Sequence, residues 1–371
     1  MDGTQVVSLE TFSDRRISIV RAKTLDGSVG YGQISTHNAD ISATVFHRQV
    51  APHALGRSSD DVDSIVQDGL RAEYKFPGSY MCRALSGLDT ALLDLRGRRE
   101  GVSVARLLGG EERPVKVYGS SMRRDISPEE EADRLVRLRD EKGYEAFKIR
   151  IGSVNGNDAD QWPGRTEELI KTVRERLPDD VRLFADANGC YTPKRAIEVG
   201  RLLQDYGFSQ YEEPCPYMEI EWTRQVTSAL DIPVSGGEQD YDINQWKRIV
   251  DTGAVGIVQP DIGYVGGIGR ASRVAEMAAA RGLLCRPHSA NRSMVTLFTA
   301  HLVTSLANFG EYLEYSIEEE PFTRGLFSPE LEVADGRVRI SSEPGFGVEV
   351  SREWIGRAER VETRIQHLPS S

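Results

Sequence analysis

The chain has few cysteines, no long apolar segment and no excess of positive charge. It contains 371 residues, and its four cysteines, Cys82, Cys190, Cys215 and Cys285, include no CxxC pair. Reduced cytosolic thiols fit this pattern better than zinc ligands or a disulfide framework. No apolar run approaches the roughly 20 residues that a membrane helix needs, so the sequence predicts no membrane anchor.

The charge balance excludes a further class of protein. The formal net charge of −11 and the pI near 5.2 argue against a surface that binds nucleic acid. The segment Met-Asp-Gly-Thr-Gln at the start has no basic region followed by an apolar core. No signal peptide is visible, so we expect a cytoplasmic protein. Charged residues make up 28% and the apolar set 39%, which is typical of a soluble globular protein.

Three acidic residues lie at equal intervals of 26 residues: Asp186, Glu212 and Glu238. Each follows a strand-like run, and helical patterns fill the space between them, which indicates parallel βα units. A barrel of such units brings its strand ends together at one face. Carboxylates that converge there would repel one another without a cation, and their oxygens suit Mg²⁺. A role as helix N-caps explains one such acid better than three at equal spacing.

The chain before the barrel pattern reads as an antiparallel sheet followed by helices. Residues 5–12 predict a strand, and residues 17–34 predict a hairpin that turns at Asp26-Gly27. Helical periodicity covers residues 42–72 and 79–99. These elements indicate an α+β unit.

From Val115 onward, strands and helices alternate. Ser127 to Glu130 reads as a capping box, and Thr192-Pro193 as another helix start. Eight strands are expected, with strand three ending at Asp186, four at Glu212 and five at Glu238. Strands six, seven and eight are predicted at residues 256–260, 283–287 and 312–315.

The predicted fold class is therefore α/β, a TIM-like (β/α)-barrel of the (β/α)7β type with an α+β capping domain. After about residue 325 the chain returns to short strands and turns, which suggests a return to the first domain. We expect the capping domain at 1–112, the catalytic barrel at 113–325, and a C-terminal segment at 326–371 that rejoins the capping domain.

Polar residues continue at the later strand ends with Asp261, His288 and Glu314. Strands six and seven are neighbours in a barrel, so Asp261 can reach an imidazole nitrogen of His288. A carboxylate partner fixes the tautomer and raises the pKa, which makes His288 a usable acid–base group. A lone histidine is more often a surface residue, but the acid at the adjacent strand end favours the catalytic role.

Strand two contains Lys148-Ile149-Arg150. Side chains alternate along a strand, so Lys148 and Arg150 share a face while Ile149 points the other way. If the apolar neighbours pack on helices, both cations point into the barrel. Because a barrel has no edge strand, we interpret them as substrate contacts rather than as solvated charges.

Together these residues resemble the enolase superfamily, mandelate racemase subgroup. The resemblance rests on Lys148-x-Arg150, on the acids Asp186, Glu212 and Glu238, and on the pair Asp261 and His288. Further matches are Ser86-Gly-Leu-Asp-Thr-Ala-Leu-Leu-Asp94, Leu-Leu-Gly-Gly110 and Pro344-Gly-Phe-Gly-Val.

The resemblance implies one Mg²⁺ per subunit, held by Asp186, Glu212 and Glu238, with Asn188 beside it. It also implies that Glu314 hydrogen-bonds the substrate carboxylate. The implied assembly is a homo-oligomer, a dimer or an octamer, that acts on a small-molecule carboxylate.

Strand two departs from the family pattern. The family commonly has Lys-x-Lys there, and its second lysine is a base. Arg150 occupies that place and cannot deprotonate at working pH. Lys148 can still bind the substrate carboxylate.

The common reaction of this family removes a proton α to a carboxylate. Mg²⁺, Lys148 and Glu314 would stabilise the resulting enediolate. A racemase needs bases on both faces, and only the His288 side is well supplied. This favours dehydration of a sugar acid, an aldonate or an aldarate, to a 2-keto-3-deoxy acid.

Two alternatives stay open. One is a racemase or epimerase of an α-hydroxy or amino acid that uses Tyr118 or Lys148 as second base. The other is a non-catalytic sugar-acid binding protein. Cycloisomerisation is less favoured, because Gly256-Ile-Val-Gln-Pro260 lacks the lysine that such relatives carry on strand six.

Specificity is expected from loops over the barrel mouth, at residues 13–16, 36–40 and 74–80. Arg15 or Arg16 in contact with a second carboxylate would favour diacids. A solvated charge is the equal alternative for either arginine.

Overall fold

The computed structural model describes residues 3–289 and 291–365. Its first part is an antiparallel sheet of strands β1 (Val6–Ser13), β2 (Ser18–Thr24) and β3 (Val29–Ile34). The predicted hairpin is confirmed, because β2 pairs with β3 and Thr24 N–H donates to Ser28 O at 3.0 Å across the turn.

Helices follow this sheet. They are α1 (Ala39–Val45), the π-helix η1 (Phe46–Val50), α2 (Ala51–Ala54), α3 (Val62–Ala72), α4 (Ser79–Glu100) and α5 (Val104–Leu107). The prediction of helical structure over residues 42–72 is wrong between α2 and α3. The chain leaves the helix at Leu55, because Gly56 N–H donates to Val6 O at 2.9 Å and Ser58 bridges Gln5. Pairing with the first strand thus overrides the helical periodicity.

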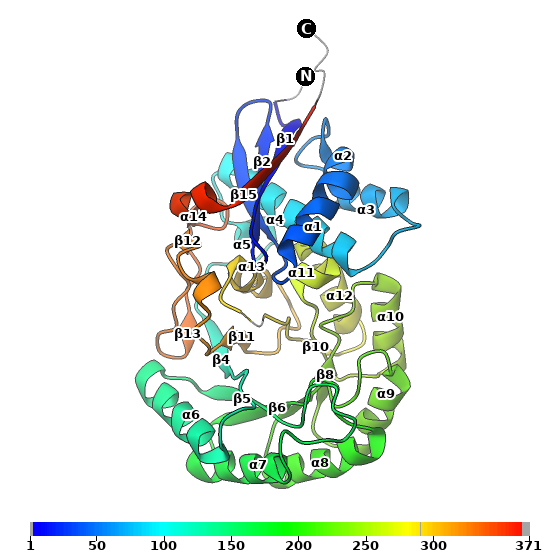
Figure 1. Cartoon of the computed structure of the whole chain (residues 1–371), viewed down its shortest axis with the longest axis vertical. Coiled ribbons are helices and arrows are strands. Elements are labelled where there is room, and N and C mark those ends of the chain that lie inside the picture. Colours follow the sequence, from blue (N-terminus) through cyan, green and yellow to red (C-terminus); the bar gives the residue numbers. More distant parts are fainter. Residues whose placement is uncertain (1–2, 290, 366–371) are drawn as a thin grey trace.

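Helix α4 packs directly against the sheet (Figure 1). Glycines on β3 make this close approach possible. A Cβ on Gly30 would lie 2.3 Å from Ala91 O, and one on Gly32 would lie 2.4 Å from Thr90 Oγ1. Neither position tolerates a side chain without moving α4 away from the sheet.

The second part is a barrel of parallel strands. They are β4 (Val115–Ser120), β5 (Ala146–Arg150), β6 (Arg182–Asp186), β7 (Gln210–Glu212), β8 (Val234–Gly236), β9 (Ile257–Val258), β10 (Leu284–Cys285) and β11 (Leu313–Ser316). Their order in the sheet is β10-β9-β8-β7-β6-β5-β4-β11, which follows the chain except for β11. A parallel bridge between Cys285 and Phe309 joins the β10 side to the segment before β11. The predicted fold class is confirmed.

Helices connect and cover these strands. They are α6 (Pro128–Lys142), α7 (Arg165–Arg176), α8 (Pro193–Asp205), α9 (Ile220–Ala229), α10 (Ile243–Thr252), α11 (Ile262–Val265), α12 (Ile268–Ala279) and α13 (Met294–Val303). The capping box of Ser127 and Glu130 is confirmed at the start of α6. Thr192 occupies the N-cap position of α8, but its hydroxyl donates to Asp158 Oδ2 at 2.8 Å rather than capping the helix.

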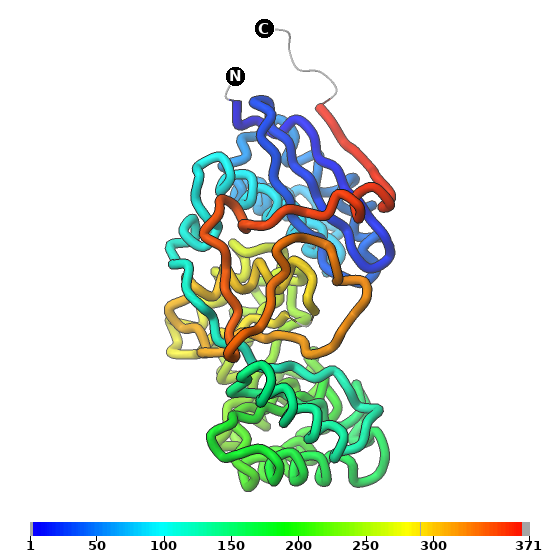
Figure 2. The backbone as a smooth tube through the Cα atoms, turned by 90° about the vertical axis from the view of Figure 1, so that its left-hand side faces the viewer, coloured from blue at the N-terminus to red at the C-terminus, as the bar shows by residue number. Residues whose placement is uncertain are grey.

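The remaining elements are η2 (Pro321–Thr323), β12 (Phe327–Ser328), β13 (Arg337–Val338), β14 (Glu349–Val350), α14 (Arg352–Arg357) and β15 (Glu359–Arg364). Strand β15 pairs antiparallel with β1, and Figure 2 shows this red segment beside the blue N-terminal strands. Strand β13 instead pairs with β4 of the barrel. The C-terminal segment therefore contacts both parts, and the domain boundaries 1–112, 113–325 and 326–371 stay a prediction.

Two composition-based expectations concern the whole fold. All four cysteines are buried and free, in agreement with the predicted thiols. Among the described residues, helices long and apolar enough to cross a membrane are absent.

Candidate active site

The polar residues of three barrel strands form one row. In the parallel register Arg150 pairs with Asp186, and Asp186 pairs with Glu212. All three are the last residues of their strands and are buried. The chain therefore places these charges side by side at the carboxyl ends of β5, β6 and β7, as the spacing predicts.

Glu238 lies beyond its strand. The prediction that strand five ends at Glu238 is wrong, because β8 ends at Gly236. Gly237 then adopts a φ of +103°, and a Cβ there would lie 2.3 Å from the ring of Trp246. This glycine turns the chain so that Glu238 reaches His288, with Oε2 3.3 Å from Nε2.

Lys148 is fully buried among carboxylates. Its Nζ lies 2.5 Å from Glu212 Oε1, 2.7 Å from Glu314 Oε1 and 3.4 Å from Asp186 Oδ2. Burial alone would lower the pKa of Lys148, but the charges of Glu212 and Glu314 outweigh it and raise the pKa. Lys148 is therefore held as a cation that neutralises the centre of the barrel.

Arg150 contacts the adjacent strand end and the loop after it. Its Nη1 donates to Asp186 and, at 2.9 Å, to Asn188 Oδ1, while Nε donates to Ser121 O at 2.9 Å. A second arginine, Arg124, also donates to Asn188 Oδ1, at 2.8 Å. Two guanidinium groups thus share one amide oxygen beside Asp186.

His288 lies between an orienting acid and two further acids. Its Nδ1 is 2.7 Å from Asp261 Oδ2, and its Nε2 is 3.3 Å from Glu238 and 3.9 Å from Glu314. Burial would lower the pKa of His288, but Glu238, Glu314 and Asp261 together raise it to about 10. The imidazole is thus oriented by Asp261 through Nδ1, and its Nε2 faces the other acidic groups.

Glu314 lies between Lys148 and His288. Its Oε1 accepts from Ser120 Oγ at 2.7 Å, and its Oε2 accepts from Ser289 N–H at 2.9 Å. Burial would raise the pKa of Glu314, but Lys148 and His288 outweigh it and lower the pKa. Glu314 is therefore a fixed carboxylate between the lysine and the histidine.

Two site residues adopt left-handed backbone conformations. Asn188 has a φ of 42° and Glu213 also has a φ of 42°. Such conformations are uncommon for residues other than glycine and cost energy. They lie one or two residues after Asp186 and Glu212, and Gly189 N–H donates to Glu213 O at 2.8 Å. The two loops thus support each other while the acids stay at the strand ends.

The acids Asp186, Glu212 and Glu238 suit Mg²⁺ in their chemistry, since all their donors are carboxylate oxygens at or just beyond the ends of adjacent strands. Burial and the charge of Glu212 raise the pKa of Glu238. A cation among these acids would relieve that repulsion. In the described part of the chain, no three His, Cys, Asp or Glu side chains already enclose a metal site. Lys148 and Arg150 draw Glu212 and Asp186 toward themselves instead.

Several site residues were not predicted from the sequence. Gln259 donates to Glu212 Oε2 at 2.7 Å, and Ser120 and Ser289 bind Glu314. Gln259 directly follows β9, so its place at a strand end was a signal. Arg124 lies in the loop after β4 and had no such signal.

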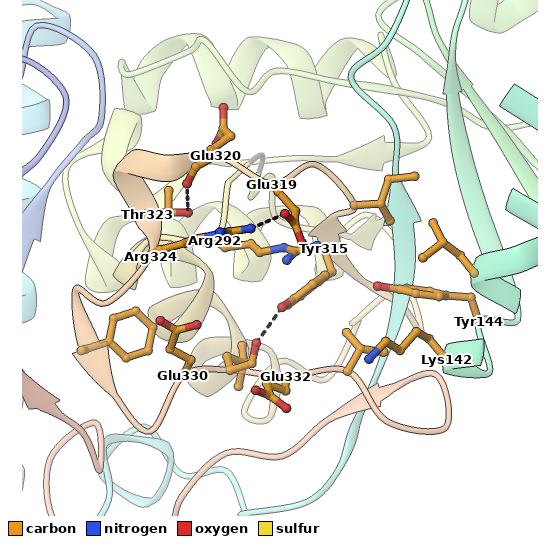
Figure 3. Close-up of a pocket in the computed structure, with 15 residues that line it drawn as sticks. Lys142, Tyr144, Arg292, Tyr315, Glu319, Glu320, Thr323, Arg324, Glu330 and Glu332 are labelled. Carbon is orange, nitrogen blue, oxygen red and sulfur yellow. Dashed lines mark hydrogen bonds and ion pairs between the residues drawn. The ribbon is translucent and has the colours of Figure 1, made fainter. Parts of the chain in front are cut away.

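A separate cavity of about 410 Å³ lies on the outer side of β11 (Figure 3). It is lined by charged side chains such as Glu319, Glu330 and Arg324, and by Tyr315, whose hydroxyl donates to Leu331 O at 2.6 Å. Tyr315 and Glu314 alternate along β11, so Glu314 faces the opposite side. This cavity is not part of the candidate site.

The chain matches two family models. Residues 130–354 match the enolase C-terminal domain-like model. Residues 2–109 match the N-terminal domain of mandelate racemase and muconate lactonizing enzyme. Together the two matches cover most of the chain.

Two curated relatives, both dehydratases, share a quarter or more of the sequence. L-talarate/galactarate dehydratase of Salmonella typhimurium is 29% identical, covering 91% of this chain and 82% of the relative. Arabinonate dehydratase of Saccharolobus solfataricus is 25% identical, covering 93% and 92%.

Solved structures show the same architecture. A Roseobacter denitrificans protein, provisionally described as a racemase, is 53% identical with a TM-score of 0.96, covering 97% of this chain and 100% of that one. A mandelate racemase/muconate lactonizing protein of Paracoccus denitrificans, complexed with magnesium, is 28% identical with a TM-score of 0.90, covering 98% and 99%.

Proposed function

The chain belongs to the mandelate racemase and muconate lactonizing enzyme family of the enolase superfamily, and on this basis we propose that it dehydrates a sugar acid. The substrate is an aldonate or aldarate, and the product is a 2-keto-3-deoxy acid. The dehydratases among its relatives support this reaction class. The observation that carries the proposal is the acid–base pair of His288 and Asp261, together with Arg150 at the end of β5, which cannot act as a base.

In its neutral form His288 takes the α-proton of the bound acid at Nε2 while Asp261 holds Nδ1–H. The charge of Glu238 is the first of those that raise the pKa of His288, so a cation held by Glu238 would lower that pKa and favour the neutral form. The proton and the β-hydroxyl leave the substrate together as water, since the same imidazole can return the proton to the departing oxygen. The enol that remains tautomerises to the 2-keto acid. Asp261 supports this step because its Oδ2 is 2.7 Å from Nδ1 and fixes the ring.

Lys148 and Glu314 bind the substrate carboxylate in this proposal. Lys148 Nζ supplies positive charge where negative charge develops on the carboxylate. Glu314 contributes when it is protonated, because a carboxylic acid donates its O–H to a substrate oxygen and a carboxylate cannot. Arg150 and Asn188, which are joined by a hydrogen bond of 2.9 Å from Nη1 to Oδ1, orient the substrate in this proposal.

Asp186, Glu212 and Glu238 would hold one Mg²⁺, as the magnesium complex of the Paracoccus relative supports. When bound, the ion supplies electrostatic stabilisation of the negative charge on the substrate carboxylate. The assembly of the chain into a dimer or an octamer stays a prediction.

Racemisation or epimerisation is the second candidate, because the Roseobacter relative is provisionally described as a racemase. That reaction needs a base on the face opposite His288. Burial raises the pKa of Tyr118 well above its ordinary value, and Lys148 is held as a cation. Both groups are thus poor bases near neutral pH, which favours dehydration.

A substrate screen tests the proposal. Sugar mono- and diacids are incubated with the protein and Mg²⁺, and 2-keto acid formation is measured with and without EDTA. We expect at least one acid to give keto acid that chelation abolishes. Keto acid from no acid, together with tight binding of one, would instead indicate a binding protein.

Thermal unfolding tests the metal ligands independently of turnover. A ligand that binds only the folded state at 100 times its Kd stabilises by about 2.7 kcal/mol. We expect saturating Mg²⁺ to raise the Tm of the native protein and not that of Glu238→Gln. An equal rise in both proteins would remove Glu238 from the ligand set.

A further inference from the structure

A row of cations from the first domain lies over the barrel face that carries His288. The end of β3 contacts the start of α13: Gln33 Nε2 donates to Ser293 Oγ at 2.9 Å, and Met294 N–H donates to Gln33 Oε1 at 3.0 Å. Asn291 Nδ2 also donates to Thr36 Oγ1 at 3.2 Å. These bonds fix the loop within a few residues of the histidine.

Arg83 of α4 is the innermost of these cations. Its guanidinium lies over the ring of Tyr264, with Cζ 3.7 Å from the ring centroid. The Tyr264 ring in turn lies 6.0 Å from that of His288, and Tyr264 N–H donates to Asp261 Oδ1 at 3.0 Å. One aromatic ring therefore separates Arg83 from the acid–base pair.

Hydrogen bonds to the loop after β3 hold the Arg83 side chain in place. Its Nη1 donates to Ser35 Oγ and, at 3.5 Å, to Thr36 O. The next two residues, His37 and Asn38, have φ values of 63° and 51°, and Asn38 Nδ2 donates to Tyr80 OH at 3.2 Å. Two successive left-handed residues are uncommon outside glycine and indicate a constrained turn.

Further positive charge lies outward from Arg83. The Arg16 guanidinium lies over the ring of Phe322 at 5.1 Å, and the His37 ring lies 6.3 Å from the same ring. Burial, Arg16 and Arg83 all lower the pKa of His37, so both guanidiniums act on it. The acid that faces Arg16 is Glu320, whose charge interacts with it.

Arg83 and Arg16 form no ion pair with any carboxylate in residues 3–289 and 291–365, although 57 acidic residues occur in the chain. Arg83 is partly buried. Its guanidinium contacts the Tyr264 ring, Ser35 Oγ and Thr36 O, none of which carries a negative charge. A planar fork of donors suits a carboxylate, so an anionic group of a ligand would complete this set of contacts.

We propose that Arg83, supported by Arg16, binds a second carboxylate at the distal end of the substrate, so that the preferred sugar acid is a dicarboxylate. This inference rests on the proposed function, in which Lys148 and Glu314 bind the first carboxylate. It names aldarates over aldonates as the substrate class.

Binding to a protein that does not turn over tests this assignment apart from the reaction. The background is His288→Asn with Mg²⁺, and the probes are an aldarate and the aldonate of the same configuration, titrated by calorimetry. We expect the aldarate to bind at least about tenfold tighter. Adding Arg83→Met removes this preference and leaves the aldonate Kd within about threefold of its starting value.

Two further variants distinguish the effect of losing the Arg83 charge from an effect on folding. Arg96→Met removes a cation from the same helix, where Arg96 Nε pairs with Glu100 Oε1 at 2.7 Å, and it leaves both Kd values unchanged. Arg83→Gln retains a polar side chain for Ser35 and Thr36 but removes the charge, and we expect it to lose the preference too. If Arg83→Met does not fold, the Arg83→Gln variant is used in its place.

Three outcomes overturn the inference: no preference for the diacid in the His288→Asn background, equal weakening of both acids by Arg83→Gln, or binding of neither acid. Keto-acid formation by the protein that retains His288 is measured separately. Its absence alongside diacid-specific binding counts against dehydration but not against the Arg83 site.

Discussion

Replacement of His288 by asparagine removes the only acid–base group that Asp261 orients among the described residues. The residue is 3% exposed, with Nδ1 2.7 Å from Asp261. Asparagine offers an amide N–H to the same carboxylate, so Asp261 keeps a partner and the fold is retained. The expected effect therefore falls on turnover rather than on folding.

Loss of one general acid–base role costs about 10²–10⁴ in rate, which is roughly 3–5 kcal/mol on the barrier. In the proposed reaction His288 both takes the α-proton and returns it to the leaving hydroxyl, so we expect a fall of at least about 10⁴ in kcat. The assay follows 2-keto acid formation from an acid that the native protein dehydrates, and Mg²⁺-dependent unfolding reports that the metal site is intact.

His53→Asn is the matched control, because His53 lies in α2 of the first domain and pairs with Glu73 at 3.4 Å. It is expected to retain native turnover. A folded His288→Asn protein that keeps more than about one tenth of native kcat would remove His288 from the mechanism, because even one lost proton transfer costs more.

Further predictions concern Arg150, the sheet–helix contact and acid stability. Arg150→Lys loses the Nε contact with Ser121 but keeps the charge, so we expect measurable dehydration together with new α-proton exchange in D₂O; a folded, inert variant would contradict this role. Gly30→Ala places a methyl 2.3 Å from Ala91 O and should lower the free energy of unfolding, measured in urea, by about 2–3 kcal/mol. Gly356→Ala meets open space and should leave that free energy unchanged. Equal effects of the two substitutions would refute the packing argument. Burial lowers the pKa of His301 to about 4, so the unfolded state binds the proton more tightly. The contribution of His301 to stability is present above its unfolded pKa and is lost as the pH falls from about 6.5 to about 4, by about 3 kcal/mol. His301→Gln should flatten this dependence in denaturation curves, and an unchanged slope would contradict it.

The sequence predicts those site residues that recur at a regular spacing along the chain. The carboxylates recur at 26-residue intervals, and the parallel register places Asp186 beside Glu212, while Glu238 lies two residues beyond its strand. Lys148 and Arg150 are likewise predictable, because side chains alternate along a strand. The structure brings all of these residues together, while their ligand and catalytic roles stay proposals.

The sequence does not predict the residues that lie outside any regular spacing, and the reason is physical. Arg124 and Arg83 reach the site or its rim from a loop and from a helix of the first domain, so only tertiary packing brings them there. The break in the helix predicted over residues 42–72 likewise depends on a long-range bond, from Gly56 N–H to Val6 O. The end of β8 before Glu238 depends on Gly237 packing against Trp246.

The fate of the α-proton tests the central claim most directly. An acid that the protein consumes is incubated in D₂O with Mg²⁺, and both product and recovered substrate are examined by NMR. The account predicts a 2-keto-3-deoxy acid with deuterium at C3, and no inversion at C2 of the recovered acid. Deuterium at C2 of an epimerised acid, without any keto acid, would contradict dehydration and establish racemisation or epimerisation as the reaction.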